Sequence, residues 1–140
     1  MNALVIVGLV IAWALTAFLA LTYYKAGKFK LTAPIDTLVA AGLAWTKEIP
    51  AGLVRLIGLV ELLGAAGIIL APAASEFLGW GWALVWGIAA AAGLTFTMLV
   101  GATMHVVRGE FKYTYKINTA LILASAALSV LLVYVGGPLF

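Results

Sequence analysis

The chain has 140 residues, of which 66% are hydrophobic and only 9% are charged. A soluble domain carries about 25% charged residues, so this composition excludes a soluble fold and indicates an integral membrane protein. The chain has no cysteine and one histidine. These counts exclude disulfides, thiolate catalysis and iron–sulfur ligation, and we expect no metal site within a single chain. We expect a single membrane domain over residues 1–140.

Four apolar runs are long enough to cross a bilayer. A spanning helix needs about 20 predominantly apolar residues, because each residue rises about 1.5 Å through a hydrocarbon core about 30 Å thick. The runs that meet this length occupy residues 3–24, 51–71, 80–104 and 117–135. The sequence therefore predicts an all-α fold, a transmembrane four-helix bundle. We expect the second run to end at Pro72 and residues 73–79 to form a loop.

The segment between the first and second runs is more polar and has a helical period of its own. Its apolar residues recur three and four positions apart, at Ile35, Leu38, Val39, Gly42 and Leu43. That spacing is typical of a helix with one apolar stripe, and Pro34 suits a first helical turn. We predict a short interfacial helix over residues 34–45, with its apolar stripe facing lipid or the bundle.

The basic residues predict the orientation of the chain. All eight lie in or beside the first and third connections: Lys25, Lys28, Lys30, Lys47, Arg55, Arg108, Lys112 and Lys116. Basic residues concentrate on the cytoplasmic side of membrane proteins. We therefore expect these two connections in the cytoplasm and both termini outside, in a cell membrane and specifically a bacterial inner membrane. The net charge of +3 then reflects topology and attraction to membrane lipid, and we expect no nucleic-acid partner.

Several polar residues interrupt the apolar runs. An ionisable side chain at the centre of a spanning helix costs roughly 2.5–3.5 kcal/mol, so such residues should face protein or water. The predicted ligand-binding or functional polar cluster consists of Arg55, Glu61, His105 and Asn118. Arg55 and Glu61 are six residues apart, roughly 120° around an ideal helix, so they need not pair directly. The sequence leaves open whether Arg55 extends sideways or His105 is a partner. The alternatives are that Arg55 extends to the headgroups, Glu61 is a hydrogen-bonded packing residue, His105 is interfacial, and Asn118 joins helices.

The third run also carries a ridge with a spacing of four residues. Its members are mostly small: Ala89, Gly93, Thr97, Gly101 and His105. Small residues at this spacing let helices approach closely in lipid. The ridge therefore predicts a close helix–helix contact.

Two motifs carry a resemblance to a known family. The second run contains IGxxExxGAxG at residues 57–67, and HxxRGE follows at residues 105–110. With these motifs in this order, the chain resembles the DoxX-like family of small four-helix membrane proteins. The matched polar positions are Arg55, Glu61, His105 and Asn118, with Arg108 and Glu110 as secondary site residues. The segment 112–116 departs from the family pattern, because it is unusually aromatic.

The resemblance implies several functions. Relatives are associated with quinol or thiosulfate oxidation and with oxidative-stress complexes, and an animal relative assists receptor assembly. The first hypothesis is an accessory subunit of a membrane redox or quinone-linked system, which binds a quinone or similar lipid and has no covalent cofactor. Its partner would be a membrane redox enzyme or another membrane protein.

Two other functions stay open at this point. One is a non-catalytic membrane assembly or chaperone protein. The other is a small proton-coupled carrier, suggested by Glu61, although the sequence has no clear inverted repeat. The sequence shows no self-contained catalytic site, so the catalytic residues and any enzymatic activity are left open. Homo-oligomerisation is also left open.

Overall fold

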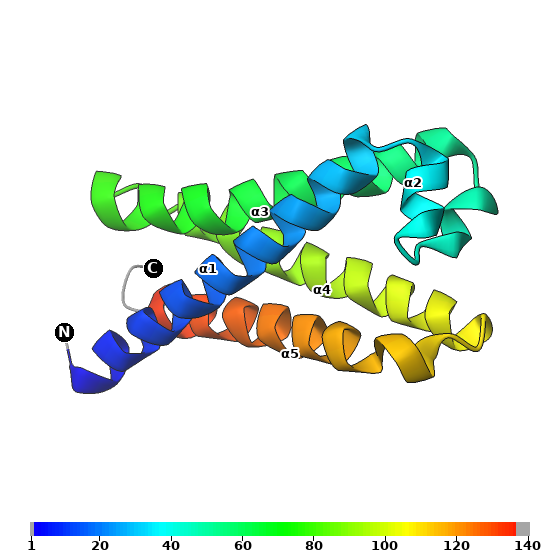
Figure 1. Ribbon diagram of the computed structural model, residues 1–140. Helices are drawn as coiled ribbons and strands as arrows, with labels where there is room; N and C mark the ends of the chain where they lie inside the picture. The colour runs from blue at the N-terminus through cyan, green and yellow to red at the C-terminus, as the bar shows by residue number, and fades with distance from the viewer. Residues whose placement is uncertain (1, 137–140) are drawn as a thin grey trace.

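The computed structural model describes residues 2–136. The predicted all-α bundle is confirmed, and Figure 1 shows its helices. In chain order they are α1 (Ala3–Thr32), α2 (Ile35–Ala40), the 3-10 helix η1 (Ala44–Lys47), α3 (Ala51–Leu78), α4 (Ala83–Val107) and α5 (Phe111–Gly136). Four of them, α1, α3, α4 and α5, are long and apolar enough to cross a membrane.

The four long helices pack in a closed order. Helix α1 contacts α3 and α5, and α4 contacts the same two helices from the other side. Figure 1 shows α1 running obliquely across the bundle, with α2 at the end where α1 stops. Each long helix contributes a side chain with almost no exposure to the centre: Leu19, Ile68, Leu94 and Leu128. Close packing of such side chains holds membrane helices together, since lipid competes for apolar contact.

The long helices extend beyond the predicted spans. Helix α1 continues through the lysines after Tyr24 and stops just before Pro34, because the residue that precedes a proline disfavours helical backbone angles. Helix α5 begins at Phe111, directly after a turn in which Gly109 has a φ of 69°. The third connection is therefore a short turn, and Lys112 and Lys116 belong to the helix.

The second span was predicted to end at Pro72, but the helix that carries it does not end there. Helix α3 passes through Pro72 and ends at Gly79, which has a φ of 68°. Pro72 packs against Gly87 of α4, where an added Cβ would lie 2.9 Å from the proline ring. A proline inside a helix removes one backbone hydrogen bond, yet α3 continues for six more residues to Leu78. Glu76 consequently lies on α3, and its carboxylate accepts a hydrogen bond of 2.9 Å from the Trp13 indole.

The predicted interfacial helix over residues 34–45 is divided in two. Helix α2 ends before Gly42, and η1 follows. Gly42 has a φ of 94°, in the region of positive φ that favours glycine. Leu38 and Trp45 pack together with Val54 of α3 in a small second core. The apolar stripe therefore faces the bundle at Leu38, and this core attaches the segment to the end of α3.

The close helix contacts do not lie on the predicted ridge of α4. A Cβ added at Gly93 would meet no atom within 4 Å, and Ala89 is also exposed. A close backbone approach joins α1 to α3, where a Cβ on Gly27 or on Gly58 would lie 2.7 Å from the carbonyl oxygen of the other glycine. Gly67 of α3 and Gly87 of α4 also leave no room for a side chain, facing Ala90 and Pro72 across the α3–α4 contact. Small residues therefore bring α3 close to both α1 and α4, and those of α4 lie off the predicted ridge.

Candidate functional site

Glu61 is paired with Lys30. The Lys30 ammonium lies 2.8 Å from both carboxylate oxygens, and the Glu61 residue is only 2% exposed. The close approach of Gly27 and Gly58 brings the two helices near enough for this bond, because each glycine lies three residues before one partner. Neither Arg55 nor His105 bonds to Glu61, because Arg55 bonds to the Lys30 carbonyl oxygen and His105 to Glu110. Lys30 was expected in a connection, but it is the cation that compensates the buried carboxylate.

Arg55 binds the end of α1. Its guanidinium donates a hydrogen bond to the carbonyl oxygen of Lys30. The last carbonyl groups of a helix have no partner within the helix and carry a partial negative charge, so a cation is favourable there. Arg55 and Glu61 therefore do not bond to each other, but both bond to Lys30, one to its backbone and the other to its side chain.

A second polar network closes the turn between α4 and α5. His105 Nδ1 lies 3.1 Å from one oxygen of Glu110, and Arg108 Nε donates to the other oxygen at 2.9 Å. Arg108 also bonds to Glu48, which precedes α3. Hydrogen bonds with Arg108 and then His105 lower the pKa of Glu110. The hydrogen bonds that Arg108 donates to Glu110 and then to Glu48 raise the pKa of Arg108. This network joins α4 to the η1–α3 connection.

Asn118 lies apart from these groups. It is 6% exposed, and its amide donates a hydrogen bond of 3.1 Å to the Thr114 hydroxyl one turn earlier on α5. Among residues 2–136, the four members of the predicted polar cluster form no hydrogen bond with one another. The structure thus places Arg55 and Glu61 around Lys30, His105 in the α4–α5 turn, and Asn118 on α5. Their functional role stays a prediction.

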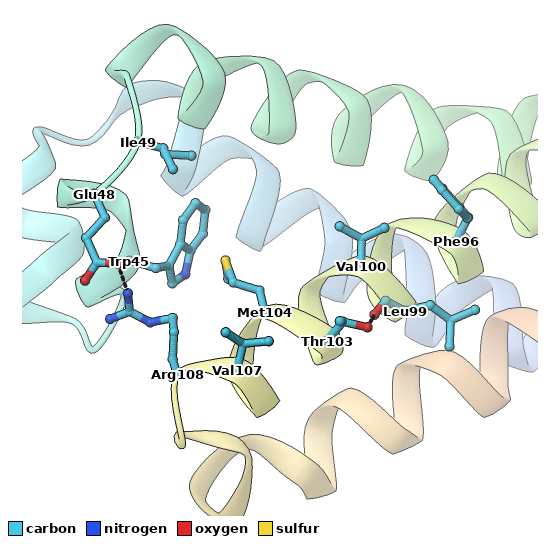
Figure 2. Close-up of a pocket in the computed structure, with 10 residues that line it drawn as sticks. All are labelled: Trp45, Glu48, Ile49, Phe96, Leu99, Val100, Thr103, Met104, Val107 and Arg108. Atoms are coloured by element: carbon cyan, nitrogen blue, oxygen red, sulfur yellow. Dashed lines mark hydrogen bonds and ion pairs between the residues drawn. The ribbon is translucent and has the colours of Figure 1, made fainter.

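An open cleft of about 670 Å³ lies between α4 and the η1–α3 connection. Figure 2 shows its lining residues: Trp45, Glu48, Ile49, Phe96, Leu99, Val100, Thr103, Met104, Val107 and Arg108. The polar groups gather at one end, where Glu48 meets Arg108 beside Trp45. The rest of the lining is apolar, and the hydroxyl of Thr103 donates to the Leu99 carbonyl at 2.9 Å. The cleft is therefore amphipathic, with one polar end and an apolar remainder.

The α4 side of the cleft has a helical period that could have been found in the sequence. Its residues follow the helical spacing of three and four: Phe96, Leu99, Val100, Thr103, Met104 and Val107. This is the period of one helix face. Trp45, Glu48 and Lys30 were also missed as site residues. Their roles depend on contacts between distant segments, which no local pattern in the sequence reveals.

The fold and the cleft define a class of protein, a small four-helix membrane protein whose amphipathic cleft opens beside one helix. A model of the DoxX-like family matches residues 14–133, so the chain belongs to the DoxX-like family. Comparison with curated proteins and with solved structures finds no significant match.

Proposed function

We propose that this DoxX-like protein binds a lipid-like amphiphile, such as a quinone, in the cleft beside α4. The observation that carries the proposal is the division of the cleft into a polar end and an apolar groove. Glu48 and Arg108 lie at the polar end, and the groove continues along α4 to Phe96. A headgroup at the polar end would place its tail along the groove.

The size and composition of the cleft support this proposal. Its volume of about 670 Å³ falls within the range of about 300–1,000 Å³ for small-molecule sites. Such sites are mostly apolar, with a few polar groups that fix the orientation of the ligand. A quinone bound there would exchange electrons with a partner enzyme of the same membrane, and the present protein would hold or deliver the quinone as an accessory subunit.

The orientation of the chain belongs to the same proposal. The eight basic residues support a cytoplasmic position for the α2 end of the bundle, by the positive-inside rule. The polar end of the cleft lies at this α2 end, since Glu48 precedes α3 and Arg108 follows α4. The headgroup of the bound amphiphile would then lie in the cytoplasmic leaflet, and its tail would point toward the bilayer centre.

The test is to fill the groove and identify the lipid that remains bound. The protein is purified in a mild uncharged detergent, and its lipids are extracted and identified by mass spectrometry. We expect one amphiphile to be enriched with the wild type and lost from Val100→Trp. The matched control is Val130→Trp on α5, because both valines are exposed, 54% and 68%, and Val130 does not line the cleft.

The comparison of the two variants decides the proposal. Retention of the amphiphile by Val130→Trp and its loss from Val100→Trp, with both variants folded, would support the cleft as the site. Equal retention by both variants would overturn the proposal, and so would a wild type that carries the same lipids as any control membrane protein.

A second candidate function is the assembly of other membrane proteins. The observation that favours it is the exposed small residues of α4, since Gly93 would accept a Cβ without contact and Ala89 is exposed. Small residues on a lipid-facing surface let a helix of another protein approach closely. Gly93→Leu should then release a co-purifying protein while the amphiphile stays bound. Retention of that protein by the variant would argue against this surface.

A further inference from the structure

The charges at the polar end of the cleft indicate which headgroup it accepts. Among the described lining residues, Arg108 is the one cation and Glu48 the one carboxylate. Arg108 looks like a site for an anionic headgroup, because guanidinium groups bind phosphates and carboxylates. However, the Arg108 guanidinium is already hydrogen-bonded to carboxylates of the protein itself.

Arg108 is bonded by protein carboxylates on two sides. Its Nε and Nη2 lie 2.9 Å and 2.8 Å from the same oxygen of Glu110, and its Nη1 bonds to Glu48. The Arg108 side chain is 18% exposed. A phosphate could bind here only by displacing these bonds, and the two carboxylates would repel it.

The local charge therefore opposes an anion. Arg108 contributes one positive charge against the two negative charges of Glu48 and Glu110. His105 balances the remaining negative charge only when it is protonated. A cationic headgroup is also disfavoured, because Glu110 does not line the cleft. Inside the cleft the cation would meet the Arg108 guanidinium, and Glu48 is already paired with Arg108.

We infer that the cleft selects an amphiphile with an uncharged, hydrogen-bonding headgroup and excludes phosphate-bearing and cationic amphiphiles. The inference rests on the proposed function and narrows its ligand class. A hydroxyl or carbonyl headgroup can hydrogen-bond beside Glu48 and Arg108 without breaking their bond. Such a headgroup would lie beside the Trp45 ring, which Figure 2 shows at the polar end of the cleft.

The test is a competition between amphiphiles that differ only in the headgroup. Purified protein in an uncharged detergent binds a radiolabelled, short-tailed benzoquinone. The competitors share one alkyl tail and carry a hydroxyl, a trimethylammonium or a phosphate headgroup. We expect the hydroxyl compound to displace the benzoquinone, and each charged compound to be about tenfold weaker or more, because like charges across an interface are unfavourable. A tenfold difference corresponds to about 1.4 kcal/mol.

Variants that release Arg108 should change this order. Glu48→Gln leaves the guanidinium with one carboxylate partner, and Glu110→Gln does the same without changing a lining residue. We expect either variant to improve displacement by the phosphate compound about tenfold. The control is Asp36→Asn, which changes the net charge equally at an exposed residue that does not line the cleft. It should leave the order unchanged.

The outcomes separate the inference from the proposed function. If the wild type does not bind the benzoquinone, the proposed function fails. If the wild type binds the benzoquinone and a charged compound displaces the benzoquinone as well as the hydroxyl compound does, only the inference about the headgroup is overturned. The inference is also overturned if Asp36→Asn improves displacement by phosphate as much as Glu48→Gln and Glu110→Gln do.

Discussion

The ammonium of Lys30 and the carboxylate of Glu61 form a buried ion pair between α1 and α3, with 2.8 Å from the nitrogen to each oxygen. The exposed fractions of the two side chains are 11% and 2%. A lone charge at this place would be costly, whereas a hydrogen-bonded pair compensates both charges. Each residue therefore explains why the other is tolerated inside the bundle.

Removing one partner of this pair should destabilise the bundle strongly. We expect Lys30→Met or Glu61→Gln to cost about 3–5 kcal/mol, because the other charge stays buried without compensation. The double variant Lys30→Met with Glu61→Leu should recover most of this loss, since apolar residues can replace a buried ion pair. Thermal unfolding in detergent measures all three variants. A double variant that loses as much as the two single variants together would contradict the pairing.

The contact between Gly27 and Gly58 should tolerate no side chain. A Cβ on Gly58 would lie 2.7 Å from the Gly27 carbonyl oxygen, so Gly58→Ala should lower stability by about 1–3 kcal/mol. Gly93→Ala is the matched control, because its Cβ would meet no atom within 4 Å. The control should be neutral or slightly stabilising, since alanine favours the helix. Equal melting temperatures for the two variants would show that α1 and α3 are further apart.

The turn between α4 and α5 should weaken in acid. Hydrogen bonds from Arg108 and His105 lower the pKa of Glu110, so its carboxylate binds a proton less readily in the folded protein. The resulting stability is present above the ordinary glutamate pKa of about 4.3 and is lost as the pH falls through the lower folded value. The melting temperature of the wild type should exceed that of Glu110→Gln near neutral pH, and the difference should shrink below about pH 4. A difference that stays constant across this range would contradict the role of the carboxylate.

Single cysteines should report the proposed orientation. The chain has no cysteine of its own, so each variant carries one labelling site. We expect cysteine at Lys28 or Lys112 to be protected from an impermeant maleimide in intact cells and cysteine at Glu76 to react. All three positions are exposed. Permeabilised cells provide the control for reactivity, and labelling at Lys28 in intact cells would reverse the orientation.

The number and order of the long helices could be predicted because hydropathy over about 20 residues reports lipid exposure directly. Helix ends were harder to predict. The lysines after Tyr24 are polar, yet α1 continues through them and through Gly27, and it stops only just before Pro34. Pro72 was expected to end the second span, but α3 continues past it, and Pro72 packs against Gly87 of α4. Hydropathy reports the membrane-buried length of a helix, and the helix itself can extend beyond that length at both ends.

The site could be predicted only where its residues are close in sequence. His105, Arg108 and Glu110 belong to one short motif, and the structure joins them in one network. The partner of Glu61 is Lys30, which is 31 residues away, and the partner of Arg108 across the cleft is Glu48, which is 60 residues away. Such pairs depend on how the helices cross, and a single sequence does not specify the crossing.

Photo-crosslinking tests the cleft most directly. An uncharged amphiphile with a benzoquinone head and a diazirine in its tail is bound to the wild type, irradiated, and mapped by peptide mass spectrometry. The account predicts crosslinks on the face of α4 that carries Leu99, Val100 and Thr103, and their loss in Val100→Trp. Crosslinks concentrated on the exposed side chains of α5, at Leu123 and Val130, and unchanged in that variant would contradict it.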